Sequence, residues 1–425
     1  MPAGNAVRKE RPATRASAGR AQAPSRGKGS AAAGRGSRGR LQPAGGKPAS
    51  SPRAGAKAKA KAKASRAELS YFIMLPTLAL LLIGLVMVFS AGSVMGMGQG
   101  AGGYKYFYMQ FGWAVIGFGL MAFFTRFDYH KLGKLSLAGV LLSLGLLGMV
   151  LAIGTEIGGA RRWIAVGPLT LQPTELAKVT LVVFTAYVLA VKGKKTRKLS
   201  HLLFPVGLFL AADVVLMMLQ PDMGSTLVLC FCIMLLFGVA DTKPGHLLAL
   251  GGGGAALALV FAFSASYRRA RLFSFINPWK SPRGAGYQVI QSYIALGSGR
   301  VRGLGLGMSR QKFLYLPNAH TDFIFAIIGE ELGLIGTLVV VVLIGLLAVG
   351  GMRVARRAPD DMGRFLAIGL TALIVIQAIV NMGGVTGLLP ITGVPLPFVS
   401  AGGSSLVVCM ASIGILVNIS RQCRA

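Results

Sequence analysis

The chain has 425 residues, of which 53% are apolar and only 14% are charged, and its mean hydropathy is +0.63. A soluble globule of this size needs more surface charge, so the composition excludes an ordinary soluble enzyme. Lys and Arg number 45 against 13 Asp and Glu. That imbalance alone would suggest a nucleic-acid-binding protein, but the hydropathy favours a membrane protein, so we expect a membrane and no nucleic acid as partner.

The first 66 residues contain 17 Lys and Arg and a single acid, Glu10. They have too few large apolar side chains to form a core, which predicts a disordered basic cytoplasmic tail on residues 1–66 and a membrane domain on 67–425. The tail is too long to be the basic region of a secretory signal, because in a signal the apolar segment follows a short basic region. Either it is simply solvated, or it is attracted to anionic lipid on the cytoplasmic side.

Apolar segments long enough to cross a bilayer, about 20 residues each, recur along the rest of the chain. We expect about ten transmembrane helices, near residues 71–93, 106–125, 135–153, 172–191, 201–218, 223–240, 244–266, 323–346, 365–386 and 402–420. The last two come from one charge-free run, 365–420, which a Pro- and Gly-rich segment divides. The predicted fold class is therefore all-α and polytopic.

The distribution of Lys and Arg in the connecting segments sets the orientation. With the tail in the cytoplasm, the inner segments carry 15 basic residues, whereas the outer ones, one excepted, carry three. This predicts that both termini are cytoplasmic. The exception is the large outer loop between helices 7 and 8, residues 267–321, which has nine Lys and Arg and no acid.

The cations of this loop include Arg268, Arg269 and Arg271, followed by Lys280, Arg283, Arg310 and Lys312. Guanidinium and ammonium groups suit phosphate oxygens. An outward location excludes nucleotides or DNA as the usual partner, so lipid-linked diphosphates remain. Contact with anionic lipid headgroups is the alternative.

Asp322 follows the basic loop and precedes the next apolar run. A carboxylate at such a place would work as a general base for a sugar hydroxyl. Alternatively, Thr321 or Asp322 caps the following helix. About two turns further on, at least one of Glu330 and Glu331 must face the protein interior, in a polar relay or an interhelical hydrogen bond.

Glu175 and Lys178 are three residues apart in the fourth predicted span, so they would lie on one helix face and neutralise each other. They form either a buried structural pair or a substrate-facing pair, the latter favoured by Arg161, Arg162 and Trp163 just before them. The Gln-Pro-Asp sequence ending at Asp222 is typical of a tight turn that this acid caps.

The sequence contains no motif typical of a disulfide, zinc or nucleotide site. The four cysteines, Cys230, Cys232, Cys409 and Cys423, have no CxxC spacing, and we interpret them as small apolar side chains. No cluster has zinc-ligand spacing, and no glycine-rich loop has the context of a nucleotide site. A protein-held metal is not expected, although a divalent cation such as Mg²⁺ bridging a diphosphate stays open.

Several motifs resemble those of the SEDS family of FtsW, RodA and SpoVE. They are GARRWI (159–164), QPTELAK (172–178), QPDMGS (220–225), GYQ (286–288), ALGSG (295–299), QK (311–312), AHTDFIFA (319–326), GEELG (329–333), PLPFVS (395–400) and GGSS (402–405). They occur in the family's order over roughly residues 70–420. The segments at 267–279 and 319–322 are similar to those of division members more than elongation members. Departures are Asn318, Arg300 and Ala401, where the family usually has an acid, a glycine and an aromatic residue.

The resemblance implies a peptidoglycan glycosyltransferase that polymerises lipid II during septal cell-wall synthesis, in the bacterial inner membrane. It implies partnership with a class B penicillin-binding transpeptidase and other division proteins, and it gives Asp322 the role of catalytic base. The expected substrate-binding residues, from charge pattern and motifs together, are Arg161, Arg162, Trp163, Glu175, Lys178, Arg268, Arg269, Arg271, Gln291, Ser292, Lys312, His320, Thr321, Glu330, Ser400 and Ser404.

Two other functions remain open on the sequence. A lipid II flippase would use intramembrane polar residues such as Glu175, Lys178 and Asp213 as a pathway. A non-catalytic scaffold would only recruit the transpeptidase. A long basic outer loop that ends in a carboxylate favours the enzyme.

Overall fold

The computed structural model describes residues 52–423 except 99–102, 158–159, 168, 264–265 and 314, so residues 1–51 of the predicted tail lie outside the described part. Residues 52–66, expected in that tail, are helical. The elements are α1 (Pro52–Gly98), α2 (Lys105–Arg126), α3 (Tyr129–Ile153), β1 (Thr155–Ile157), β2 (Ala160–Val166), β3 (Leu169–Leu171), α4 (Pro173–Lys192), η1 (Gly193–Arg197), α5 (Leu199–Leu202), η2 (Leu203–Gly207), α6 (Leu208–Leu219), α7 (Met223–Val239), α8 (Pro244–Phe263), α9 (Ser266–Ile276), η3 (Pro278–Lys280), α10 (Tyr287–Gly299), α11 (Ile324–Arg357), α12 (Asp361–Val385) and α13 (Gly403–Gln422).

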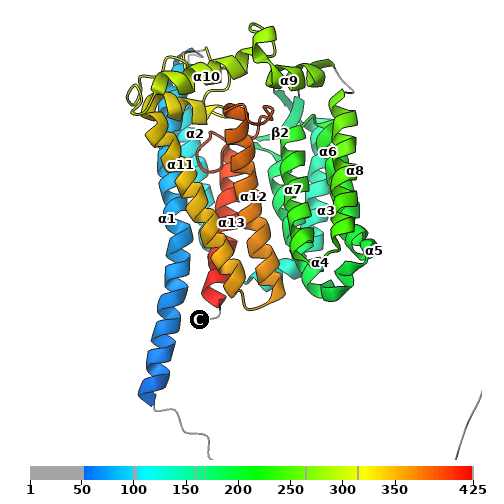
Figure 1. The fold of residues 1–425 in the computed structure, drawn as a ribbon. Helices are drawn as coiled ribbons and strands as arrows, with labels where there is room; N and C mark the ends of the chain where they lie inside the picture. Colours follow the sequence, from blue (N-terminus) through cyan, green and yellow to red (C-terminus); the bar gives the residue numbers. More distant parts are fainter. Residues whose placement is uncertain are drawn as a thin grey trace, which may run out of the picture. The chain divides into compact units, whose positions relative to one another are not determined.

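The predicted membrane spans are confirmed. In the described residues, nine helical segments are long and apolar enough to cross a membrane, and α7 adds a shorter apolar helix. Segments α5, η2 and α6 together make one of the nine. The helices stand side by side as a bundle (Figure 1). The protein is therefore an all-helical, multi-pass membrane protein.

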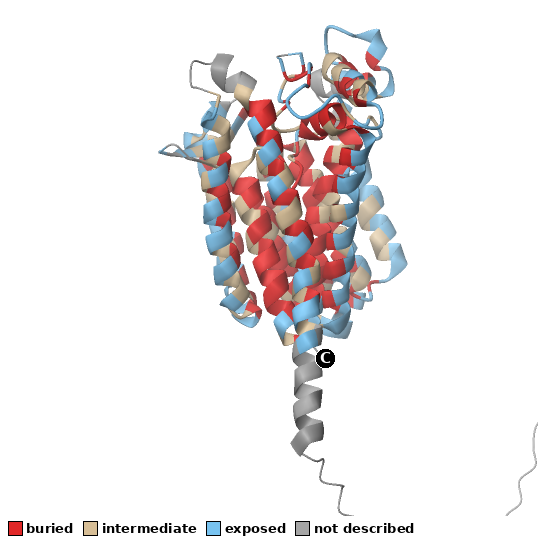
Figure 2. Ribbon diagram, turned by 90° about the vertical axis from the view of Figure 1, so that its left-hand side faces the viewer, coloured by how far each residue is buried: buried red, intermediate tan, exposed pale blue. Residues whose placement is uncertain are grey.

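The interior of the bundle is built by α4, α12 and α13, whose apolar segments are mostly buried. Figure 2 shows the buried residues on the inward faces of the helices and the exposed ones outside. By contrast, none of the apolar segment of α8 is buried within the chain, because this helix contacts only its neighbours α7 and α9 appreciably.

Both ends of the described chain lie at the same end of the bundle. Arg66 Nε donates to the Cys423 carbonyl at 2.9 Å, and the hydroxyls of Ser70 and Ser420 are 2.7 Å apart. An even number of spans requires this arrangement, so the two contacts support the ten-helix count.

Three antiparallel strands, β1, β2 and β3, occupy the connection between α3 and α4, where no sheet was predicted. Elsewhere the local sequence acts as expected. Asp222 accepts a hydrogen bond from Ser225 N at 3.2 Å and is the N-cap of α7, which confirms the capped turn.

The large outer loop is folded. It contains α9, η3 and α10, which lie across the end of the bundle opposite the C-terminus (Figure 1). Between α10 and α11 the chain runs alongside the first turns of α11, where Leu304 N and Gly305 N donate to the carbonyls of Glu330 and Glu331.

Candidate active site

Asp322 lies at the junction of the outer loop and α11 and is half-buried. The N-cap of α11 is Phe323, which makes no side-chain capping bond. The Thr321 hydroxyl donates instead to the Asn318 carbonyl at 3.2 Å. The Thr321 hydroxyl therefore does not cap this helix.

The backbone around Asp322 is held from α12 and from the connection between α12 and α13. Asn381 Nδ2 donates to the carbonyls of both Asp322 and Val394 at 2.8 Å. Ser400 Oγ donates to the Thr321 carbonyl at 2.6 Å. These bonds fix the position of the carboxylate-bearing residue, because each restrains a main-chain oxygen at or next to it.

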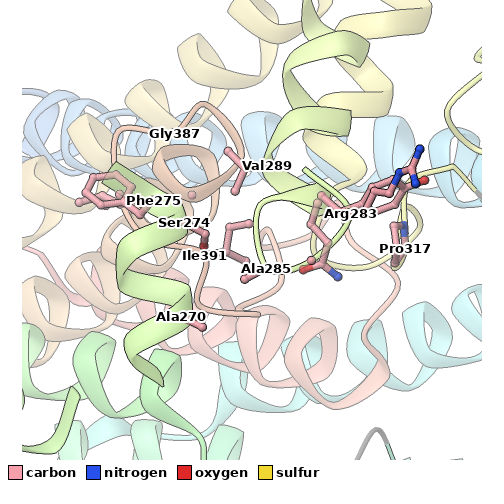
Figure 3. A pocket seen from close by; sticks show the side chains of 14 residues that line it. Ala270, Ser274, Phe275, Arg283, Ala285, Val289, Pro317, Gly387 and Ile391 are labelled. Carbon is pink, nitrogen blue, oxygen red and sulfur yellow. The ribbon is translucent and has the colours of Figure 1, made fainter. Parts of the chain in front are cut away.

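A small pocket beside Asp322 adjoins a much larger cavity. The pocket is lined by Asp322, Asn381, Gly393 and neighbours, and it shares Gly384 and Ile391 with a cavity of about 470 Å³. Figure 3 shows this cavity between α9, the start of α10 and the segment after α12. Its lining is Ala270, Ser274, Phe275, Arg283, Gly284, Ala285, Tyr287, Gln288, Val289, Pro317, Gly384, Gly387, Leu389 and Ile391.

Charge at the cavity is positive. Among its lining residues Arg283 is the charged one, and no acid is present. The predicted phosphate-binding residues Arg268, Arg269 and Arg271 lie on α9, which also lines the cavity. Arg269 is exposed, while the side chains of the other two are outside the described part. A guanidinium at the cavity would attract a diphosphate.

His320 is half-buried next to Asp322, and its ring packs 4.8 Å from that of Tyr106, centroid to centroid. Burial lowers the pKa of His320, because a charged imidazolium is poorly solvated there. Its Nδ1 has no hydrogen-bond partner among the described residues. Burial therefore favours the uncharged form of the ring at this position.

Glu330 and Lys312 were expected to bind substrate, but both are buried and occupied by other bonds. Glu330 accepts hydrogen bonds from Arg310 N and Gln311 N at 2.9 and 3.3 Å. Lys312 Nζ forms a 3.0 Å salt bridge with Glu331 and donates to the Gly307 carbonyl at 2.6 Å. These groups anchor the outer loop to α11. The prediction that at least one of Glu330 and Glu331 faces the interior is confirmed, and both side chains are buried.

Glu175 and Lys178 form the predicted pair at 2.9 Å, with the ammonium also donating to Gln377 Oε1 at 2.8 Å. Their side chains are 2% and 0% exposed. Neither lines the cavity, so the structure favours the buried structural pair over the substrate-facing one. Asp213 is also fully buried, within α6.

Arg161, Arg162 and Trp163 lie on β2 rather than in an irregular loop. Arg162 is occupied structurally, since its guanidinium donates to the carbonyls of Gln220 and Pro221 at 2.8 and 2.5 Å. Arg161 is exposed and lies 3.8 Å from the Glu156 carboxylate. None of the three lines the cavity beside Asp322.

The remaining predicted residues, Gln291, Ser292 and Ser404, lie on α10 and α13. Ser292 is buried on α10 and donates to the Val385 carbonyl at 3.0 Å, which ties α10 to the end of α12. Gln291 is half-buried on the same helix. Ser404 Oγ donates to the Thr170 carbonyl at 3.0 Å. Of the predicted set, His320, Thr321 and Ser400 are the ones placed next to Asp322.

Sequence reasoning missed Asn381 as the residue that holds Asp322. A neutral polar side chain inside an apolar span was the available signal. Ser274 and Gln288 of the cavity lining were missed as well. In the described part of the chain, no group of three His, Cys, Asp or Glu side chains is arranged to hold a metal ion. The residues beside Asp322 thus do not form a metal cage of their own.

The geometry defines a polytopic membrane protein in which a folded basic loop covers a carboxylate at the end of the helix bundle. Residues 71–425 match the family described as "Cell cycle protein", which groups FtsW, RodA and SpoVE. The chain belongs to this family.

Individual relatives cover most of the chain. A probable peptidoglycan glycosyltransferase FtsW of Geobacter sulfurreducens is 41% identical over 312 residues, covering 73% of this chain and 84% of that protein. Stage V sporulation protein E of Bacillus subtilis is 41% identical over 319 residues, covering 74% and 87%.

Two solved structures share the fold. The first, described as showing structural coordination of polymerization and crosslinking by a peptidoglycan synthase complex, has a TM-score of 0.67 and 28% identity, covering 82% of this chain and 96% of that one. The rod shape determining protein RodA of Thermus thermophilus has a TM-score of 0.61 and 27% identity, covering 84% and 97%.

Proposed function

We propose that this protein is a peptidoglycan glycosyltransferase that polymerises lipid II into glycan strands, with Asp322 as the general base. The observation that carries the proposal is the position of Asp322 beside a cavity of about 470 Å³ whose charged lining residue is Arg283. The names of relatives such as the Geobacter protein support the same reaction.

In the proposed reaction the Asp322 carboxylate removes the proton from the 4-hydroxyl of the acceptor sugar. The resulting oxygen nucleophile attacks the anomeric carbon of the donor chain, and undecaprenyl diphosphate leaves with the bonding electron pair. Arg283 and the arginines of α9 stabilise the departing diphosphate, since negative charge develops there. Lys178 and Lys312 are left out of this role because each is buried against a carboxylate.

The partner and the location are parts of the same proposal. Similarity to a subunit of a peptidoglycan synthase complex supports a class B transpeptidase as partner. The excess of Lys and Arg in the predicted inner segments supports cytoplasmic termini in the bacterial cytoplasmic membrane. The division-like motifs support a septal site of action. A divalent cation would have to be held largely by the substrate diphosphate, and no step here depends on one.

The test is polymerisation of purified lipid II by the detergent-solubilised protein together with its transpeptidase. Wild type is compared with Asp322→Asn and with Asp361→Asn, an exposed acid at the opposite end of α12. We expect glycan products from wild type and Asp361→Asn but not from Asp322→Asn. Products from all three proteins would move the base elsewhere. Translocation without polymer would favour a flippase, and complex formation with neither activity would favour a scaffold.

A further inference from the structure

Residues 301–308, here called the apolar loop, expose large hydrophobic side chains after the end of α10. Val301, Leu304, Leu306 and Met308 are 58%, 40%, 60% and 65% exposed. Glycines fill the alternate positions from 303 to 307. An apolar surface of this kind on a water-facing loop indicates a partner that covers it.

The height of the apolar loop follows from its main-chain bonds to α11. Leu304 N and Gly305 N donate to the carbonyls of Glu330 and Glu331 at 2.9 and 3.0 Å. Just below, α11 continues after the non-helical Gly333 as a charge-free helix over 334–352. These 19 residues span about 28 Å against a hydrocarbon thickness of about 30 Å. The apolar loop therefore lies at the outer edge of the hydrocarbon layer.

The lipid-facing surface of α11 continues directly into this loop. Leu334, Ile335 and Leu338 are each more than half exposed. Leu334 N donates to the Arg300 carbonyl at 2.9 Å, and Ile335 N donates to the Val301 carbonyl at 3.3 Å. The loop and the start of the membrane-spanning part of α11 thus form one apolar face.

Irregular backbone is costly in a bilayer unless its polar groups are satisfied within the protein. The glutamates of α11 meet this requirement for the apolar loop and the residue after it. Glu331 accepts from Gly307 N at 3.0 Å and from Ser309 N at 3.3 Å. The exposed surface of the loop is consequently made of side chains, while much of its backbone is bonded to α11.

Exposed cations lie just before, within and just after the apolar loop. Arg300, Arg302 and Arg310 are all exposed, and guanidinium groups suit the phosphates of lipid headgroups. Apolar side chains with adjacent basic residues are the pattern of segments that lie in a membrane interface.

We propose that the apolar loop inserts into the outer leaflet, with Val301, Leu304, Leu306 and Met308 among the upper acyl chains and the neighbouring arginines at the phosphates. The partner is the lipid surface itself, because the loop continues the lipid-facing side of α11. The insertion fixes the height of the outer loop above the membrane. It does not depend on the reaction proposed for Asp322.

The test uses the full chain in lipid nanodiscs with an environment-sensitive fluorophore on Leu306→Cys. The background is Cys230→Ala, because the other three cysteines are buried. The matched control is Ser281→Cys, exposed in the segment between α9 and α10 that rises highest in Figure 1. We expect the probe at 306 to emit at shorter wavelength, to be quenched by lipids with a spin label high in the acyl chain, and to be at least fivefold less sensitive to iodide than the probe at 281.

Equal iodide quenching at both positions would overturn the proposal. Shielding of position 306 only after the transpeptidase is added would also overturn it, and would make the loop a protein-docking surface. If Leu306→Cys does not yield monodisperse protein, Met308→Cys gives the same readout from the same loop. Polymerisation activity is measured separately, so loss of activity and loss of insertion are distinguishable.

Discussion

Replacing Glu331 by Gln tests whether a buried ion pair holds the outer loop on α11. The Glu331 side chain is fully buried and accepts from Ser90 Oγ at 2.7 Å, Gly307 N at 3.0 Å and Lys312 Nζ at 3.0 Å. Glutamine keeps one acceptor oxygen but removes the negative charge. The Lys312 ammonium, 4% exposed, is then left without its counter-charge.

The expected cost follows from that geometry. Breaking a buried pair by removing one partner costs about 3–5 kcal/mol, and the retained amide oxygen puts this change near the lower figure. Since each 1.4 kcal/mol is tenfold in an equilibrium constant, local opening of the loop should become roughly 100-fold more frequent. Opening should be local, because the bundle interior formed by α4, α12 and α13 does not involve this pair.

Hydrogen exchange of the loop amides measures the effect. We expect faster exchange at Gly307 and Ser309 in Glu331→Gln, with little change in α13. The double variant with Lys312→Met should recover at least tenfold of the lost protection, because it removes the unpaired charge. Exchange within threefold of wild type at both amides, or no recovery in the double variant, would refute the assignment of the ion pair as the loop anchor.

Two further changes near α10 have matched controls. Gly299→Ala should lower stability by about 1–3 kcal/mol, because the added Cβ would lie 1.8 Å from the Gly329 carbonyl oxygen. In the control Gly297→Ala the added Cβ meets nothing within 4 Å, so the higher helix propensity of alanine should raise stability by up to about 1 kcal/mol. Arg300 has a φ of +48°, so Arg300→Gly should relieve strain and raise stability by about 1 kcal/mol, while Arg302→Gly should give no gain. Thermal unfolding in detergent checks both pairs, and equal shifts within either pair would contradict the reasoning.

The transmembrane architecture was predictable because hydropathy acts locally. Each apolar run specifies a helix without knowledge of its neighbours, so all ten apolar segments were found, although the helix predicted over 323–346 continues to Arg357. The Glu175–Lys178 pair was predictable for the same reason, since three positions along one helix set the distance. The sheet was missed because β2 pairs with strands of only three residues each, too short for a periodic signal.

The candidate site was only partly predictable, because its contacts join distant segments. Asp322 was identified from its position and its motif, but the bond from Asn381, 59 residues away, is set by the packing of α12. The pairing of Lys312 with Glu331 likewise depends on how the loop returns to α11. Lys312 was therefore predicted to bind substrate because of its charge, whereas in the structure it pairs with Glu331 and holds the outer loop on α11.

One stretch of α11 connects the reaction to the membrane. The charge-free part of α11 begins at Leu332, directly after Glu331, and Ile324 begins the helix itself, a separation of eight residues or about 12 Å of helix. The polar headgroup region occupies roughly 5–8 Å on each side of the hydrocarbon. Asp322 thus lies at or just beyond the headgroups, the level that a sugar joined to a membrane-held diphosphate would occupy. Glu330 and Glu331 lie between the start of α11, next to Asp322, and the start of its charge-free part. The acids that anchor the outer loop therefore also help to set the height of Asp322 above the hydrocarbon layer.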